Sequence, residues 1–441
     1  MALLQAGLLA QSCACNTSIP QGDTISPLTL LALLTGLTGG VLQERTEPHT
    51  LATFLDDRNL VAKTPEDAAK LWKTWKELSP RVGLQENDAK VQVVPRAADF
   101  KPRLLQAGFS ENQIADSARV LGVDITARLN ATHRPTKETR IQETHARLER
   151  IGLLPVSADV KAALTCSLAI PKAVWGLWLT PFSAKPLSTR IKRISGGQHV
   201  TCSTNLFFLL AGHGLNPNFA AGFGAYIYLA DIVRHHPRTW PNTSPRGTWL
   251  GTVRQWLLGL QWQEQGAWTW VHPEVNFCID WNQPISVDIK QKEHHALRET
   301  WRRQQFALFM SSGRRDAAAV QDCVYNESRV TCARKIFRSC NTHSRACMIG
   351  AVVSDARLDK IKNPDHPPAP CSWCSTGDVP TWHHLAWECS AFRDTRGAVP
   401  QDPLQRVLGW PFGQDHQTDA SVLEHLGNVR ERMLDRRYRG N

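Results

Sequence analysis

Apolar and polar positions recur with helical spacing in two segments of the first hundred residues. The apolar stretch Leu28–Leu37 follows Ser26-Pro27, an N-cap residue and a first-turn proline, and we expect Gly39-Gly40 to end this helix. A second helix is predicted to start at Thr64-Pro65, with acidic residues in its first turn. Its apolar positions share one helix side: Ala68, Leu71, Trp72, Trp75 and Leu78.

Short extended segments surround the second helix. Thr50–Leu55 and Asn59–Ala62 are predicted to be strands of a hairpin, with Asp56-Asp57-Arg58 as its turn. Gly83 is expected to end the unit, and Lys90–Val94 is predicted to be a further strand. Strand, turn, strand, helix and strand in this order indicate an α+β fold containing a split βαβ unit.

The remainder of the chain is predicted to be mainly helical. Residues 101–195 carry helical periodicity with a small strand near Val120–Ile125, and residues 292–310 and 420–437 have the pattern of amphipathic helices. Periodicity is weak in the Trp-, Gly- and Pro-rich residues 196–300, which give no clear prediction. The segments expected are therefore residues 1–100, 101–195, 196–365 and 366–441.

Composition narrows the class of protein without identifying a function. The 441 residues carry a formal net charge of +11, which permits nucleic-acid binding without requiring it. Apolar and charged fractions of 42% and 21% exclude wholesale disorder and fibrous repeats, and suggest two to four domains. We expect no membrane span, since Thr24–Gln43 contains proline, threonine and glycine, and no secretory signal, since the start lacks basic residues.

Two adjacent carboxylates at the predicted hairpin form the first candidate site. Asp56 and Asp57 present oxygen ligands of the kind that Mg²⁺ prefers, although Asp pairs are common in solvated turns. Lys90 is a candidate for neutralising charge on a phosphate, or a solvated lysine at a strand edge. Taken alone, the Asp pair favours the structural interpretation, whereas both interpretations of Lys90 stay open.

Their context resembles the palm of reverse transcriptases from non-long-terminal-repeat (LINE-type) retrotransposons. Phe54-Leu55-Asp56-Asp57 is similar to the C motif, Lys90 to the D-motif lysine, and Val120-Leu121-Gly122-Val123 to the E motif, or primer grip. The B motif, which contacts template and nucleotide, is matched by Pro20, Gln21, Gly22, Asp23 and Ser26. The resemblance implies a partial right-hand polymerase palm over residues 1–100 and a helical thumb to about residue 195.

The same resemblance implies RNA-directed DNA polymerase activity in the intact protein. Asp56 and Asp57 would bind Mg²⁺ of a two-metal site, and Lys90 would act on the pyrophosphate side. An RNA template, a DNA primer and dNTPs would be the partners, in a nuclear or cytoplasmic ribonucleoprotein. The family's A-motif Asp has no counterpart among the eighteen residues before Ile19, so the isolated chain is expected to be inactive. The alternative is a catalytically inert zinc-containing nucleic-acid-binding protein.

A second candidate site lies near the C-terminus. Cys371, Cys374, His384 and Cys389 follow the spacing C-x2-C-x9-H-x4-C, which predicts a structural Zn²⁺ site. His383 competes with His384 as the imidazole ligand. We favour His384, because the H-x2-W-x-C end then resembles the motif found beyond the thumb in such retroelement proteins.

Other polar residues are predicted to be structural. Arg302, Arg303, Arg314 and Arg315 are candidates for contacting a nucleic-acid backbone, but such charges more often form a solvated helix face. The His235-His236 and His294-His295 pairs lack partner ligands at useful spacing. The cysteines outside the zinc motif are expected to be small buried apolar residues: Cys13, Cys15, Cys323, Cys332, Cys340 and Cys347.

Overall fold

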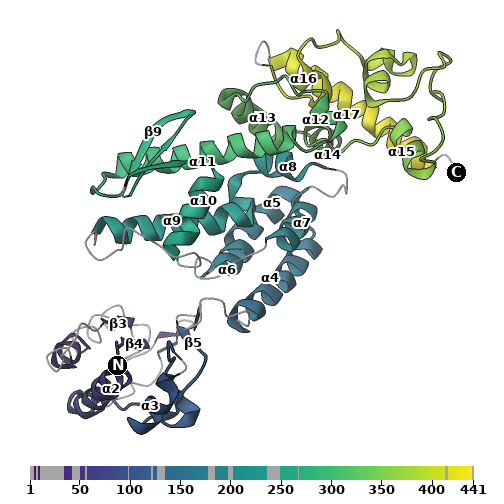
Figure 1. Ribbon diagram of the computed structural model, residues 1–441. Coiled ribbons are helices and arrows are strands. Elements are labelled where there is room, and N and C mark those ends of the chain that lie inside the picture. The colour runs from purple at the N-terminus through teal and green to yellow at the C-terminus, as the bar shows by residue number, and fades with distance from the viewer. Residues whose placement is uncertain are drawn as a thin grey trace. The chain divides into compact units, whose positions relative to one another are not determined.

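Figure 1 shows the computed structural model, which combines helices with small antiparallel sheets and confirms the mixed α+β class. The chain divides into two compact units, Met1–Glu138 and Thr139–Asn441. None of the helices described is long and apolar enough to cross a membrane. The structure describes residues 4–5, 8–9, 34–41, 50–54, 57–97, 99–120, 123–126, 135–176, 184–196, 202–235, 249–266, 268–412 and 416–439.

The first unit contains the predicted hairpin and the helix that follows it. The strands and longer helices of this unit are β1 (Leu4–Gln5), β2 (Leu8–Leu9), β3 (Thr50–Phe54), β4 (Asp57–Val61), α2 (Pro65–Leu78), α3 (Phe100–Gln106), β5 (Ser117–Val120) and β6 (Val123–Thr126). Thr64 caps α2 as expected, its hydroxyl accepting a hydrogen bond from the Asp67 backbone N–H at 3.2 Å.

Two apolar helix faces form the core of this unit. Leu71 and Trp75 of α2 are buried as the spacing predicted. They pack with the helical residues 34–41, whose buried members are Leu34, Leu37 and Val41. This helix continues through Gly39-Gly40, so the predicted end at the glycines is wrong. Packing of the leucine and valine faces outweighs the modest helix penalty of two glycines.

The hairpin is confirmed, but the sheet around it differs from the prediction. Asp57 pairs with Phe54 and begins β4, so Asp57 and Arg58 lie in a strand and not in the turn. The strand predicted over Lys90–Val94 is wrong, because Lys90 ends the 3-10 turn η2 (Asp88–Lys90). Only Val93 forms a bridge, to Ile114. Among the described residues β3 and β4 therefore pair with each other alone, without the third strand of a split βαβ sheet.

The second unit is mainly helical, as predicted for most of its length. The boundary between the units falls in the first turn of α4. The helices that precede the three-stranded sheet of this unit are α4 (Pro135–Leu153), α5 (Ala158–Leu164), the π-helix η4 (Thr165–Ala169), α6 (Ile170–Val174), α7 (Lys185–Ile194), α8 (Thr204–Ala211), α9 (Pro217–His235) and α10 (Trp249–Gly259). The elements after them are β7 (Gln263–Gly266), β8 (Thr269–His272), β9 (Val275–Asp280), α11 (Val287–Met310), α12 (Arg315–Ala318), α13 (Glu327–Ser339), α14 (Thr342–Met348), α15 (Asp355–Lys362), α16 (Pro403–Leu408) and α17 (His416–Arg439).

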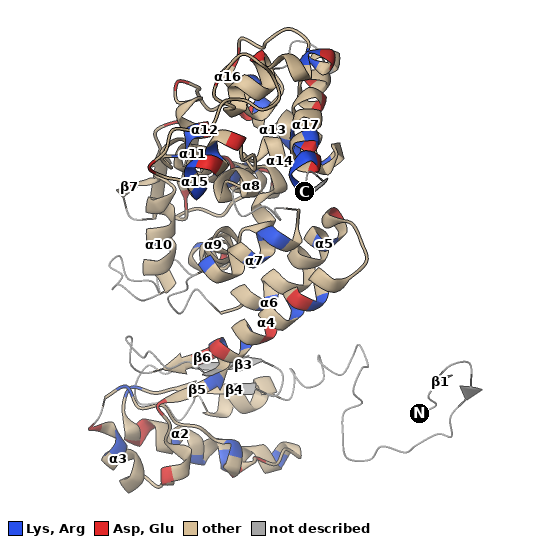
Figure 2. Ribbon diagram, turned by 90° about the vertical axis from the view of Figure 1, so that its right-hand side faces the viewer, with Lys and Arg blue, Asp and Glu red and all other residues tan. Residues whose placement is uncertain are grey.

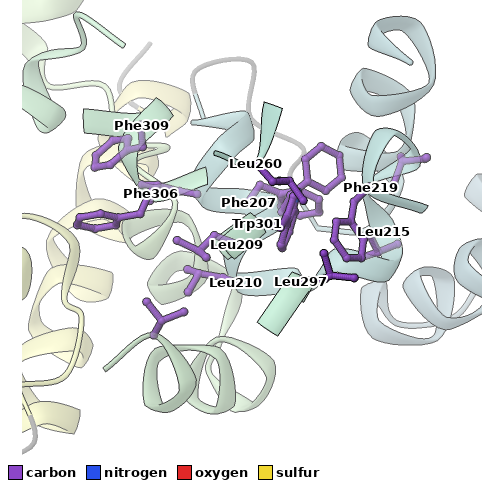
Figure 3. Close-up of a cluster of buried hydrophobic side chains, with 14 of the residues drawn as sticks. Phe207, Leu209, Leu210, Leu215, Phe219, Leu260, Leu297, Trp301, Phe306 and Phe309 are labelled. Atoms are coloured by element: carbon purple, nitrogen blue, oxygen red, sulfur yellow. The ribbon is translucent and has the colours of Figure 1, made fainter. Parts of the chain in front are cut away.

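Helix α8 lies at the centre of the large core of this unit. Residues 206–210 are all buried, because α11 and α13 both pack against α8. A helix that is apolar all round has no amphipathic period, which is why no helix could be predicted here from the pattern of residues. Figure 3 shows the surrounding cluster, which includes Phe207, Leu209, Leu210, Leu215, Phe219, Leu260, Leu297, Trp301, Phe306 and Phe309.

The tryptophan-rich segment contributes buried indoles to this large core. Trp270 and Trp281 lie 4.6 Å apart between ring centroids, and Trp268 stacks on Trp281 at 6.0 Å. Trp262 is also buried and donates from its indole N–H to the Thr300 hydroxyl at 3.2 Å. Within the described segment these large aromatics therefore serve as core residues rather than as an exposed stacking surface.

The C-terminal part adds two small apolar clusters beside the large core. One joins the predicted zinc motif to α17 through Leu385, Phe392, Val429 and Met433. The other contains Trp387. The amphipathic pattern of α17 is confirmed, since its predicted apolar positions are buried: Val422, Leu423, Leu426, Val429 and Met433.

Candidate metal centre

Four side chains with metal-binding atoms converge at the predicted zinc motif. One ligand atom from each of Cys371, Cys374, His384 and Cys389 lies within 4.8 Å of the others, a cluster that can hold a metal ion. The Sγ atoms of Cys371 and Cys389 are 4.0 Å apart, and Cys374 Sγ lies 3.4 Å from His384 Nε2. A tetrahedral zinc ion spaces two sulfurs by about 3.8 Å, and a sulfur and a nitrogen by about 3.6 Å. The donor set and its spacing therefore fit a four-coordinate ion.

Backbone hydrogen bonds fold the sequence motif into this arrangement. The Cys371 N–H donates to the Asp378 carbonyl at 2.7 Å, which closes the loop carrying the first two cysteines. His384 begins a π-helical turn, η8 (His384–Glu388), and the Cys389 N–H donates to the His384 carbonyl at 2.7 Å. This i to i+5 bond brings the last two ligands together across the x4 spacing, a use of π-turns common at functional sites.

The structure separates the two histidines. His384 is buried at 2% exposure and belongs to the cluster, whereas His383 is exposed and pairs with Glu388 at 3.3 Å. The preference for His384 is confirmed as far as the position of the side chain goes. In a helical segment adjacent residues point in different directions, so only one of two consecutive histidines can face the cysteines.

The polar surroundings of the cluster also suit a bound cation. His384 Nδ1 is buried without a hydrogen bond among the described residues, and Glu388 Oε2 lies 3.5 Å from it. A carboxylate near the second ring nitrogen is the usual outer partner of a metal-bound imidazole. Hydrogen bonds from Thr376 lower the pKa of the Cys374 thiol to about 6, whereas burial raises that of Cys389 to about 12. Neither Thr376 nor Glu388 was selected from the sequence, because only the folded loop brings them near the ligands.

Helix α17 carries several basic residues, as Figure 2 shows. Two of them stack on aromatic rings beside the ligands: the Arg436 guanidinium lies 4.4 Å from the Trp373 ring centroid, and that of Arg432 lies 4.8 Å from Phe392. Arg437 pairs with Asp355 of α15 at 2.6 Å. These arginines fasten the ligand loop and α15 to α17, so much of the positive charge of this helix is used within the chain.

Most of the residues matched to the polymerase palm motifs lie outside the described residues. These are Asp56 and the five residues matched to the B motif: Pro20, Gln21, Gly22, Asp23 and Ser26. Asp57 is placed only by its backbone, at the start of β4, and Lys90 lies at the end of η2. Val120 pairs with Val123 in the hairpin of β5 and β6, at residues that the sequence comparison matched to the E motif. The structure thus gives no geometry for a Mg²⁺ site here.

Three of the four arginines considered for backbone contacts form ion pairs within the chain. Arg302 lies 3.3 Å from Glu299, Arg303 lies 2.8 Å from Glu274, and Arg314 lies 2.8 Å from Asp316. Arg315 instead lines a hollow with Gly313, Arg314, Arg357, Lys360, Ile361 and Pro364.

The remaining histidines and cysteines match their structural interpretation in part. The His294 ring makes an edge contact with Phe223, and His295 pairs with Glu327. His236, Cys13 and Cys15 lie outside the described residues. Cys347 is fully buried as predicted, while the other three are only half-buried: Cys323, Cys332 and Cys340.

The metal cluster is thus assembled from the residues and in the order that the sequence indicated. Compared with known proteins, the chain matches no protein-family model and no curated protein. The chemistry of the described residues is therefore the basis on which a function is assigned.

Proposed function

We propose that this chain belongs to a LINE-type RNA-directed DNA polymerase, and that its Cys/His cluster holds Zn²⁺ in a module that binds nucleic acid. One observation carries the proposal: the ligand atoms of Cys371, Cys374, His384 and Cys389, which follow the spacing C-x2-C-x9-H-x4-C, converge within 4.8 Å. When bound, zinc supplies a structural cross-link that stabilises a segment with a small apolar core.

In the proposed zinc module, some residues would bind the ion and others would hold these ligands in place. Three thiolates and the His384 imidazole would hold the ion, and Glu388 would orient the ring through its other nitrogen. Trp373 and Phe392 stack against Arg436 and Arg432 of α17, and these contacts would attach the ligand loop to that helix. The module's role in this proposal is to hold nucleic acid and not to carry out chemistry.

The polymerase part of the proposal is supported by the hairpin and by the motif order. β3 and β4 form a hairpin with Asp57 at the start of the second strand. The family that the sequence resembles presents its C motif in such a hairpin, which supports the proposal. Asp56 and Asp57 would bind Mg²⁺, Lys90 would face the pyrophosphate, and the B motif would contact template and dNTP. Extension of a DNA primer on an RNA template, in a nuclear or cytoplasmic ribonucleoprotein, is the reaction proposed for the intact protein.

The alternative is a catalytically inert nucleic-acid-binding protein that retains the zinc module. It shares the observation that carries the first proposal, since an inert binder would also contain the Cys/His cluster that the structure assembles within the described ranges. Determining the coding sequence upstream of Met1 separates the two. An in-frame A-motif Asp supports the polymerase, whereas an in-frame stop codon directly upstream supports the inert binder.

The zinc module is tested by metal analysis and by binding measurements on matched variants. Cys374→Ala should lose the bound zinc and weaken binding to RNA and DNA oligonucleotides. Cys332→Ala, on α13 and outside the cluster, should retain both properties. Equal zinc content in the two variants would contradict the metal assignment. A wild-type affinity that does not change with salt concentration would contradict the binding role, because contacts to phosphates release counterions.

A further inference from the structure

Two helices of the second unit carry arginines close to one turn, formed by Gly212 and His213 directly after α8. Arg298 and Arg302 lie four residues apart on α11, and Arg334 and Arg338 lie four residues apart on α13. Residues at i and i+4 share one helix face. Because both helices pack against α8, these faces meet at the C-terminal end of α8. A Cβ on Gly212 would lie 3.3 Å from Arg334 Nη2 and 4.0 Å from Arg338 Nη2.

Among the described residues, Arg302 is the one of these four arginines that forms ion pairs with carboxylates. Arg302 pairs with Glu299 at 3.3 Å and with Glu327 at 3.4 Å. Within the part of the chain that the structure describes, Arg298, Arg334 and Arg338 have no carboxylate at ion-pair distance. Arg298 and Arg334 are half-buried, and Arg338 is exposed, so solvent reaches the group.

The excess of positive charge at this turn changes the pKa values of the groups in it. Burial, with the charges of Arg302 and Arg338, lowers the pKa of Arg334 to about 10. Burial and all four arginines lower the pKa of His213, in the same turn, to about 4. The Nε atoms of Arg298 and Arg334 are buried without a hydrogen-bond partner among the described residues. Half-buried cations that repel one another are costly unless an anion joins them.

We propose that Arg298, Arg334 and Arg338 form a binding site for the phosphate groups of a nucleic-acid strand. Guanidinium groups offer planar pairs of donors that match phosphate oxygens and keep their charge when partly buried. The Arg298 guanidinium also lies 5.3 Å from the Phe223 ring centroid, a contact that fixes its position. This inference rests on the proposed function for its source of phosphate, since nucleic acid and a free polyphosphate present the same chemistry.

The test compares the full-length double variant Arg298→Gln/Arg334→Gln with wild type. Binding to a single-stranded oligonucleotide is measured across salt concentrations. Loss of two phosphate contacts should make the slope of log affinity against log salt shallower by about 1.4, from about 0.7 for each contact. The melting temperature of the free variant should not fall, because the substitutions remove uncompensated charge. An arginine with a purely structural role would instead lower the melting temperature and leave the salt slope unchanged.

A matched control and a second probe distinguish the other outcomes. Arg345→Gln removes an arginine paired with Asp159 at 2.8 Å, and it should leave the salt slope as in wild type. Pyrophosphate should raise the melting temperature of wild type but not of the double variant. If pyrophosphate has this effect while oligonucleotide binding is equal in both proteins, the site is for a small anion and the nucleic-acid assignment is overturned. Unchanged responses to both probes overturn the site altogether.

Failure of this inference is separable from failure of the proposed function. Wild type and the double variant binding oligonucleotides equally, while Cys374→Ala binds weakly, would overturn the arginine site and leave the zinc module supported. A wild-type chain that binds no oligonucleotide would overturn the proposed function itself.

Discussion

Glu293 joins a buried polar network whose removal should destabilise the second unit strongly. Its carboxylate pairs with Arg234 at 2.5 Å and accepts a hydrogen bond from the Tyr226 hydroxyl at 2.6 Å. The side chains of Arg234 and Glu293 are only 4% and 2% exposed. Trp281 donates in turn to the Tyr226 oxygen at 3.2 Å. The network therefore links α9, α11 and the end of the three-stranded sheet.

The variant Glu293→Gln keeps the shape of the side chain and removes its charge. Arg234 is then left buried without a counter-ion, which costs about 3–5 kcal/mol in comparable buried pairs. This is a large share of the roughly 5–15 kcal/mol by which domains are stable. Urea denaturation followed by tryptophan fluorescence measures the loss, because Trp281 lies in the network and stacks with Trp268.

A double-mutant cycle separates the ion pair from general disruption. Arg234→Met and Glu293→Met should each be costly alone, whereas together they leave no unpaired charge. The double variant should therefore be more stable than the sum of the single losses by about 2–3 kcal/mol. A loss below about 1 kcal/mol for Glu293→Gln would refute the reasoning, since it would place the pair among solvent-screened ion pairs.

Three further predictions follow from the second unit. Partial burial and the neighbouring arginines lower the pKa of the half-buried His213 to about 4 from an ordinary 6.5, so on acidification the unfolded chain binds a proton first. Stability should fall by about 2 kcal/mol between pH 7 and pH 5, a loss that His213→Gln removes in denaturation curves at the two pH values. Gly222→Ala would place a Cβ 2.2 Å from the Trp256 ring and should cost about 1–3 kcal/mol, while Gly224→Ala, with open space, should not lower the melting temperature. Chelation of the metal should increase hydrogen exchange in residues 371–395 but not in the large core. Protection that is equal with and without metal would argue against a structural ion.

Local signals were sufficient where a single helix or loop decides the outcome. Thr64 capping α2 could be predicted because a threonine before proline and two acidic residues is a start signal within one turn. The zinc ligands could be predicted because thiolate and imidazole donors at short spacing imply one centre. The strand expected at Lys90 failed, since an extended pattern forms a strand only where a partner strand offers hydrogen bonds.

Other features had no local signal. Residues 206–210 are buried on all sides, so their sequence shows no period from which a helix could be assigned. The arginine group at the end of α8 combines residues from α11 and α13 that are about forty positions apart. Their i and i+4 spacing is visible in the sequence, but the lack of matching carboxylates appears only when both helices pack on α8.

The sequence by itself determined the helices with one apolar face, the presence of the β3–β4 hairpin, the donor set of the metal centre and the basic charge. Each of these depends on residues close together in the chain, where spacing fixes geometry. Tertiary structure alone decided which arginines are compensated by carboxylates and that the tryptophans form a core. Burial and charge compensation depend on residues distant in sequence, and only packing brings those residues together.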